Sequence, residues 1–230
     1  DSELILTDTG CDSRTRNLIE KYTDKIIDFE WIKDFAAARN VGLKAACGQW
    51  FMYVDDDEYF DDTTEIVNFF NSKESEKYNV AFYIQRNYTD AERKTYVDHN
   101  VDRIIRITPE LHFEHRVHEA YTGIEIGQKK MLHSFVHHYG YVYKNDEERL
   151  AKHKRNQELL EAEVREYPND MRMRYQMAIN SLSINDYDES IRLSFEAIKI
   201  QSDSEFWDAL HTNILYCYQV KKDWDKVIEC

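Results

Sequence analysis

Short hydrophobic runs separated by polar turns dominate the first part of the chain, and they predict alternating strands and helices. The runs at 4–7, 25–29 and 50–54 end in acidic or polar residues, which is typical of short strands. A helix is predicted to start near Asp12 or Ser13, and a second helix follows Asp34, which is a predicted N-cap. Elements that alternate with such short links predict an α/β fold with a parallel sheet and right-handed crossovers.

A further helix is predicted between Asp62 and Asn71, and the segments 80–85 and 102–107 alternate in the manner of strands. The stretch between these two strands, 87–100, is charged and irregular and has no strand pattern. Because binding loops are carried on rigid scaffolds, we expect this stretch to be a loop that faces the substrate.

The pattern changes near Asn145, where charged helices replace the short runs. The segment 147–167 has a helical, highly charged pattern, and Pro168 closes it. The sequence therefore predicts two domains, an α/β domain over 1–145 and an α-helical domain over 146–230.

The helical part contains an imperfect internal repeat. Asn185-Asp-Tyr-Asp-Glu-Ser-Ile matches Lys222-Asp-Trp-Asp-Lys-Val-Ile at an offset of 37 positions (222 − 185). Ala178, Ser190 and Ala197 fall where helix pairs of the tetratricopeptide kind place small residues for close packing. One such pair cannot bury its apolar face alone, so we expect it to pack on neighbouring helices.

Composition narrows the class of protein. The 230 residues are 42% hydrophobic, which permits a packed core, and the formal net charge of −14 argues against a nucleic-acid binder that needs a basic stripe.

The four cysteines have no metal-type spacing and indicate free thiols in a reducing compartment. No apolar run reaches the length of a membrane span and no signal-peptide pattern is found, so we predict a cytoplasmic protein. The sequence enters a strand at once and stops inside a predicted helix, which we interpret as a fragment of a longer protein.

The candidate chemistry centres on four consecutive carboxylates, Asp55-Asp-Asp-Glu, directly after the run at 50–54. Adjacent anions repel one another, so a bound cation would explain the cluster. Asp55 and Asp57, two positions apart at the end of a strand, could both face Mg2+ or Mn2+. A solvated acidic loop is the simpler alternative. A calcium loop of the EF-hand type is excluded, because Phe60 replaces its turn glycine and Ile66 its closing glutamate.

Histidines at three-residue spacing suggest a second metal hypothesis. His112, His115 and His118 could form the zinc site of a hydrolase. That spacing brings the rings together only on a helix, whereas Pro109 and the surrounding pattern favour strand and loop. No HExxH motif is present either, so we disfavour a zinc hydrolase.

Five ordered segments resemble the signatures of family 2 glycosyltransferases, which have the GT-A fold. They are 6–15, 34–40, 48–58, 116–119 and 137–141. With the repeats that follow, the last two resemble a bacterial subgroup with C-terminal tetratricopeptide helices, which includes peptide S-glycosyltransferases of the sublancin type and envelope-sugar transferases. The resemblance implies a parallel-dominated mixed sheet followed by an all-α helical-repeat region. In this family another strand and helix normally precede the turn that contains Asp8. At the position of Asp56 the family more often has a small apolar residue.

The resemblance also implies roles for individual residues of a donor site. Asp57 would be a direct ligand of Mn2+ or Mg2+, with His138 as a further ligand. Asp55 would bind the metal or the hydroxyl groups of the ribose and sugar, as the DXD motif of the family does. Asp8 would accept a hydrogen bond from the uracil of a UDP-sugar, although capping the strand end is an alternative role. Arg39 would be a fixed cation near the nucleotide, unless it is a solvated surface charge.

On the acceptor side the resemblance implies Glu119 as the general base of an inverting transfer, with His118 beside it to orient the base or bind the acceptor. Asp34 would orient Arg39 or merely cap its helix. The donor would be a UDP-sugar of the glucose or N-acetylglucosamine type, which makes the protein a hexosyltransferase. The acceptor would be a peptide or a saccharide.

The repeats would serve as an acceptor-binding surface or mediate a homodimer. A function of another class remains open, in which the helical repeats form a non-catalytic protein-interaction module and the α/β part is a degenerate transferase. Metal-dependent binding of UDP would discriminate between the two functions.

Overall fold

The structure, a computed structural model, describes residues 2–200 and 206–229. The chain divides into two compact units, each interrupted in sequence. The first comprises Asp1–Ile32, Ala37–Glu114 and Ala120–Tyr143, and the second comprises Lys33–Ala36, His115–Glu119 and Lys144–Cys230. Two short segments that precede the helical region in sequence, 33–36 and 115–119, therefore belong to the helical unit by their contacts.

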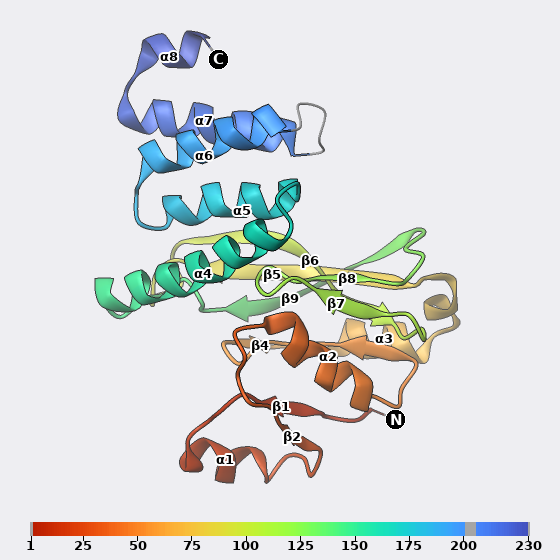
Figure 1. Ribbon diagram of the computed structural model, residues 1–230. Coiled ribbons are helices and arrows are strands. Elements are labelled where there is room, and N and C mark those ends of the chain that lie inside the picture. Colours follow the sequence, from red (N-terminus) through yellow and green to blue (C-terminus); the bar gives the residue numbers. More distant parts are fainter. Residues whose placement is uncertain (1, 201–205, 230) are drawn as a thin grey trace. The chain divides into compact units, whose positions relative to one another are not determined.

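The first unit consists of β-strands and three α-helices (Figure 1). The strands are β1 (Leu6–Asp8), β2 (Ile26–Asp28), β3 (Trp50–Met52), β4 (Glu58–Phe60), β5 (Val80–Tyr88), β6 (Tyr96–Arg106), β7 (His112–Glu114), β8 (Ala120–Thr122) and β9 (Lys129–His138). The helices are α1 (Ser13–Ile19), α2 (Phe35–Ala45), α3 (Thr64–Asn71) and the 3-10 helix η1 (Lys73–Lys77), and the first two residues of α2 belong to the second unit. α1 starts at Ser13, where a helix start was predicted, and Asp12 caps it by accepting the Thr15 N–H at 2.7 Å.

The main sheet is mixed, as predicted, and has five strands in the order β3-β6-β5-β9-β4. Parallel pairing occurs between β5 and β9 and, in a separate two-stranded sheet, between β1 and β2. The other neighbours, β3–β6, β5–β6, β4–β9 and β7–β8, are antiparallel. The expectation of parallel pairing throughout, drawn from the alternation of strands and helices, is wrong for these pairs.

The stretch 87–100 forms a β-hairpin, so the prediction of a loop there is wrong. β5 and β6 pair as far as Tyr88 and Tyr96, and Asp90 closes the turn by accepting backbone N–H groups, including that of Glu92 at 2.9 Å. The first residues of β6, 96–100, are all exposed, and a strand segment with no buried face shows no hydrophobic alternation. The charges that suggested a loop pair across the strands instead, with Arg86 2.8 Å from Asp98.

The core of the first unit lies between α3 and one face of the main sheet. Ile66 and Phe69 of α3 pack with residues of β5, β6 and β9, among them Tyr83, Ile104 and Val136, which are fully buried. Burial of such side chains stabilises the unit by roughly 1.5–3 kcal/mol each. This core fixes β5 and β9 side by side, and the polar residues at the ends of these strands are positioned by it.

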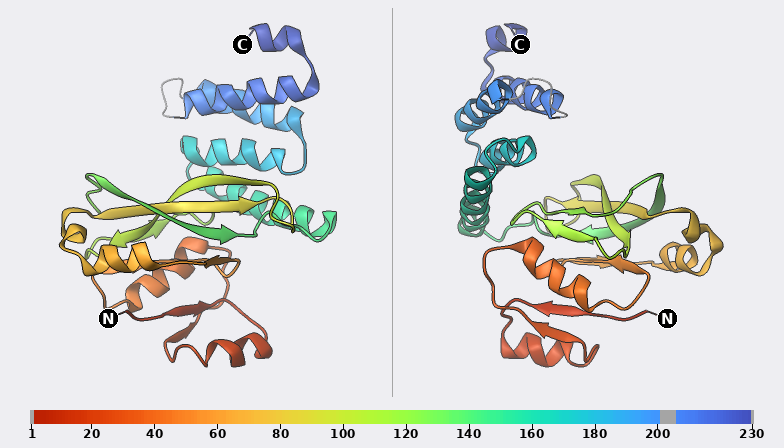
Figure 2. Two further views of the ribbon diagram at one scale, coloured as in Figure 1. Left: turned by 180° about the vertical axis from the view of Figure 1, so that it is seen from behind. Right: turned by 45° about the vertical axis from the view of Figure 1, so that its right-hand side comes forward.

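In its described residues the second unit contains five α-helices after Tyr143, and they contact one another in chain order (Figures 1 and 2). They are α4 (Asp146–Glu166), α5 (Met171–Leu182), α6 (Tyr187–Ile200), α7 (Trp207–Lys221) and α8 (Trp224–Glu229). Asn145 caps α4 by accepting the Glu148 N–H at 2.9 Å, and Asp170 caps α5 by accepting the Met173 N–H at 3.0 Å. The predicted helical region is thereby confirmed.

The internal repeat corresponds to two helix pairs with the same turn. Asn185 and Lys222 both have positive φ, 61° and 59°. Each donates its N–H to a carbonyl three residues back, at 3.0 Å in both turns. The positions are separated by the same offset as the sequence repeat, so matching residues perform matching roles.

Small residues allow close approach of the helices, as expected. Ala178, Ser190 and Ala197 are fully buried. Ser190 Oγ donates to the Ala178 carbonyl at 2.8 Å, and Asn213 Nδ2 donates to Ser190 Oγ at 2.8 Å. The polar groups buried between α5, α6 and α7 thus satisfy one another, as buried polar groups must.

Candidate functional site

The acidic turn between β3 and β4 is held from the inside by Glu58. Its side chain is fully buried, accepts the Asp55 N–H at 2.9 Å and is bound by Gln85 and Arg103. A carboxylate buried this deeply is tolerated because it is paired and hydrogen-bonded. The four carboxylates of the turn therefore differ in kind, since Glu58 is structural whereas Asp56 is exposed to solvent.

Two arginines bind Asp55. Arg103 Nη2 donates to Asp55 Oδ2 at 2.9 Å, and Arg39 Nη2 lies 3.4 Å from Asp55 Oδ1. Burial by itself lowers the pKa of Arg103, but the charges of Asp55 and Glu58 outweigh it and the pKa is raised. Arg103 is therefore a permanent cation in the site. Sequence reasoning missed it, although a charge between apolar strand positions was an available signal.

Arg39 extends from α2 over an aromatic surface. Its guanidinium carbon lies 3.8 Å from the ring centroid of Tyr53 and 5.6 Å from that of Phe113. Only 13% of the side chain is exposed, so the interpretation of Arg39 as a solvated charge is wrong. Stacking on Tyr53 fixes the orientation of the guanidinium next to Asp55.

Asp57 and His138 are brought together by the pairing of β4 with β9. Glu58 is opposite His138 in this register, and the Tyr139 N–H donates to the Asp57 carbonyl at 3.2 Å. As a result Asp57 Oδ2 lies 3.5 Å from His138 Nε2. A Cβ at Gly140 would lie 2.7 Å from Asp57 Oδ2, so only glycine leaves room for the pair.

Asp55 is not a third member of this pair. In the described part of the chain no three His, Cys, Asp or Glu side chains converge as metal ligands. The carboxylate of Asp55 is bound by Arg39 and Arg103 instead. The structure thus brings together two of the three residues predicted to hold a metal, Asp57 and His138.

Asp8 ends β1 and binds the turn that follows. Asp8 Oδ1 accepts the N–H groups of Gly10 at 2.9 Å and Cys11 at 2.8 Å, and Oδ2 accepts from Arg16 at 2.9 Å. Hydrogen bonds from Cys11, then from Gly10 and Arg16, lower the pKa of Asp8. Asp8 therefore caps the strand end, which was the simpler of its two expected roles. A contact with a nucleobase stays a prediction.

Asp34, His118 and Glu119 all belong to the second unit. Asp34 directly precedes α2, and the following N–H, that of Phe35, donates to the Arg116 carbonyl at 2.9 Å. Burial, partly offset by the charge of Glu119, lowers the pKa of His118 to about 4, so the imidazole is neutral near pH 7. The roles predicted for these three residues stay predictions.

A buried carboxylate of α4 anchors the segment 115–119. Glu163, 2% exposed, accepts the Arg116 N–H at 2.9 Å and lies 3.0 Å from His115 Nδ1. His115 and His118 both have positive φ, 74° and 54°, which is costly for residues other than glycine. The contacts with α4 therefore stabilise a turn that the backbone alone would disfavour.

The three histidines considered for zinc have separate environments. His112 lies on β7 and its Nε2 is 3.1 Å from Glu114, whereas His115 is bound by Glu163 and His118 follows in the turn. Strand followed by loop is the structure that the sequence predicts here.

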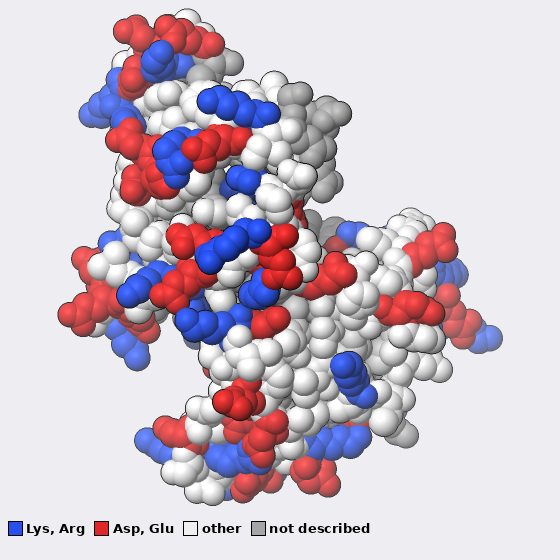
Figure 3. Space-filling view, viewed as in Figure 1, with Lys and Arg blue, Asp and Glu red and all other residues white. Residues whose placement is uncertain are grey.

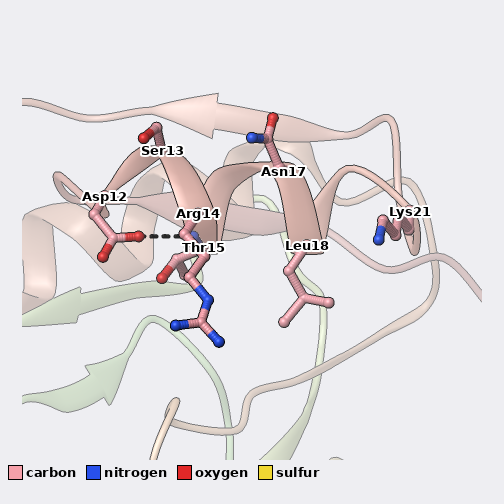
Figure 4. A pocket seen from close by; sticks show the side chains of 7 residues that line it. All are labelled: Asp12, Ser13, Arg14, Thr15, Asn17, Leu18 and Lys21. Atoms are coloured by element: carbon pink, nitrogen blue, oxygen red, sulfur yellow. Dashed lines mark hydrogen bonds between the residues drawn. The ribbon is translucent and has the colours of Figure 1, made fainter.

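Other parts of the surface carry charged side chains (Figure 3) and a depression. On the face shown in Figure 3, basic and acidic side chains are intermixed. A depression on the surface of α1 is lined by residues of that helix and its flanks, and it shares none with the acidic turn (Figure 4). Its lining residues are Asp12, Ser13, Arg14, Thr15, Asn17, Leu18 and Lys21. No helix among residues 2–200 and 206–229 is long and apolar enough to cross a lipid bilayer.

Comparison with known proteins gives two matches. The profile of glycosyl transferase family 2 matches residues 1–137. The chain is also similar to a TPR repeat-containing protein of Synechococcus elongatus, with 32% identity over 119 residues. That alignment covers 51% of this chain and 28% of the relative, so the chain spans little more than a quarter of the length of the Synechococcus protein.

Proposed function

The chain belongs to glycosyl transferase family 2, and we propose that it transfers a hexose from a UDP-sugar, bound at the acidic turn, to a peptide or saccharide acceptor. The observation that carries the proposal is the convergence of Asp57 and His138, 3.5 Å apart, at the edge of the sheet. A carboxylate and an imidazole are both ligands that a divalent cation accepts, and Gly140 leaves room for the two side chains because it carries no Cβ.

The two side chains fit a divalent cation. Mn2+ and Mg2+ are commonly held by one or two protein groups together with phosphate oxygens and water, which suits a site of two residues. A bound ion would neutralise the negative charge that develops on the departing UDP. Asp57 would supply an oxygen ligand and His138 a nitrogen ligand, and Mn2+ accepts both more readily than Mg2+ does.

Asp55 and its arginines would form the part of the site that binds the sugar nucleotide. Arg39 and Arg103 hold the carboxylate of Asp55 in one orientation, so that it can accept hydrogen bonds from the hydroxyl groups of ribose or sugar. The same two guanidinium groups supply fixed positive charge to a chain whose net charge is −14. An anionic donor needs such local charge to bind.

For the acceptor we retain Glu119 as the base of an inverting transfer, on the basis of the family resemblance. A base removes the proton of the acceptor nucleophile while the bond from the sugar to the diphosphate breaks with oxocarbenium character. His118, which is neutral near pH 7, would orient the acceptor without adding charge. The helical repeats would bind the acceptor chain or a second copy of the protein.

Calorimetric titration of UDP with and without Mn2+ tests the proposal. We expect binding to require Mn2+ and to weaken at least tenfold in Asp57→Asn. Asp56→Asn is the matched control, because Asp56 is the exposed neighbour in the same turn and should bind UDP normally. Equal binding with and without the metal would reject the metal site, and no binding in either condition would favour the interaction-module function.

A further inference from the structure

Asn87 and His138 form a buried pair at the end of the main sheet. β5 and β9 run parallel, and their register places Asn87 opposite His138. Asn87 is 3% exposed and His138 is 8% exposed. Asn87 Oδ1 lies 2.6 Å from His138 Nδ1, so a short hydrogen bond joins the two side chains away from solvent.

The orientation of the Asn87 amide is determined by two backbone carbonyls. Asn87 Nδ2 donates to the Gln85 carbonyl at 3.1 Å and to the Val97 carbonyl at 3.2 Å. A carbonyl oxygen can only accept, so both of these positions require the amide nitrogen. Rotating the amide by half a turn would oppose oxygen to oxygen twice and lose both bonds, and the oxygen of Asn87 must therefore face His138.

This orientation determines where the proton of a neutral His138 lies. Because Asn87 Oδ1 can only accept, His138 Nδ1 must donate and carry the hydrogen. The lone pair of the ring is then on Nε2, the atom that lies 3.5 Å from Asp57 Oδ2. Two electron-rich atoms that face each other in this way favour a cation between or beside them.

We infer that Asn87 is a positioning residue, which fixes His138 in the Nδ1–H tautomer and thereby presents its Nε2 to a divalent cation shared with Asp57. The inference rests on the proposed function for its purpose, since the cation belongs to the donor site. Residues that orient metal-ligating imidazoles in this way typically change metal affinity by 10–100-fold when they are replaced. No sequence pattern marks Asn87, because its role depends on strand register.

Nitrogen NMR of the metal-free protein tests the tautomer directly. With 15N-labelled histidine and a pH above neutrality, we expect His138 Nδ1 to show the shift of a protonated ring nitrogen and Nε2 that of an unprotonated one. A wild-type spectrum with the hydrogen on Nε2 would overturn the inference, and this result does not depend on whether any variant folds.

Binding of Mn2+, followed by the loss of the electron paramagnetic resonance signal of free Mn2+ in the presence of UDP, tests the consequence. Asn87→Leu keeps the branched shape and the number of side-chain heavy atoms but removes all three hydrogen bonds, and we expect the Kd for Mn2+ to rise at least tenfold. Asn100→Leu is the matched control, because Asn100 is exposed on the neighbouring strand β6, and its Kd should stay within twofold of wild type.

The outcomes separate the inference from the proposed function. An Asn87→Leu protein that binds Mn2+ as tightly as wild type would reject the positioning role and leave the metal site in place. A wild-type protein that binds no Mn2+ with UDP would reject the metal site itself, and with it the purpose that we assign to Asn87.

Discussion

Gly140 lies so close to His138 that a Cβ at position 140 would be 2.5 Å from His138 Nε2. Real Cβ atoms essentially never approach another heavy atom this closely, so the imidazole and the Asp57 carboxylate depend on the missing side chain. The geometry of this pair is thus sensitive to one added methyl group at position 140.

We expect Gly140→Ala to weaken Mn2+-dependent binding of UDP at least tenfold while the protein stays folded. The added methyl group displaces His138 or Asp57 from their present positions. Gly48→Ala is the matched control, because the nearest atom to its Cβ would be 3.6 Å away. Calorimetry with circular dichroism measures both effects, and unchanged UDP binding by Gly140→Ala would contradict the placement of the site.

Breaking the buried pair of Glu58 and Arg103 should destabilise the first unit. We expect Glu58→Gln to lower the free energy of unfolding by about 3 kcal/mol, because Arg103 would lose a partner in a buried environment. Glu92→Gln, at an exposed pair with Lys94, should change it by less than about 0.5 kcal/mol. Urea denaturation measures both values, and similar small losses in the two variants would show that Glu58 is not a structural carboxylate.

The low pKa of His118 predicts a dependence of stability on pH. Burial lowers this pKa from 6.5 to about 4, so the unfolded chain binds a proton at a higher pH than the folded protein does. Neutral His118 therefore contributes up to about 3 kcal/mol to the free energy of unfolding. This contribution is fully present above pH 6.5 and is lost as the pH falls from about 6.5 to about 4.

His118→Asn should remove this part of the pH dependence. Asparagine tolerates the positive φ at this position and does not titrate. The difference in unfolding free energy between wild type and variant, measured from pH 7.5 to 4.5, isolates His118 from the other titrating groups. A difference that stays constant over this range would mean that His118 is not buried in its neutral form.

Glu119→Gln should reduce transfer at least a hundredfold and leave the Kd for UDP within twofold, since a base acts on the acceptor and not on donor binding. The matched control is Glu114→Gln, at an exposed position on β7. Transfer from UDP-glucose and UDP-N-acetylglucosamine would be followed by release of UDP with an acceptor present. A rate near that of wild type would reject Glu119 as the base.

Lys222→Gly should stabilise the second unit by roughly 0.5–1 kcal/mol. Lys222 ends α7 with φ 59°, a left-handed conformation that glycine adopts without steric cost. Lys226→Gly, in the interior of α8, should instead destabilise by about 1 kcal/mol. Thermal or urea unfolding compares the two, and destabilisation by Lys222→Gly would show that the turn does not constrain the backbone as described.

The sequence predicted those structural features that depend on residues close together in the chain. The start of α1 near Asp12 was predicted, because the oxygen of a side chain and an N–H three residues on satisfy each other independently of the rest of the chain. The repeat around Asn185 and Lys222 was visible for the same reason, because each turn forms its own hydrogen bonds. The stretch 87–100 was predicted as a loop because the first residues of β6 are all exposed and lack the alternation by which strands are recognised.

The sequence by itself determined the alternation of strands and helices, the acidic turn and the repeated helix pairs, together with the family resemblance. Only the tertiary structure decided that Glu58 and Arg103 form a buried pair, that Asp55 is bound by arginines, and that Asn87 is opposite His138. The physical reason is that hydrophobic periodicity encodes which face of a strand is buried but not which strand lies beside it. Partners from distant strands are chosen by pairing and register, and those are settled only when the core is packed.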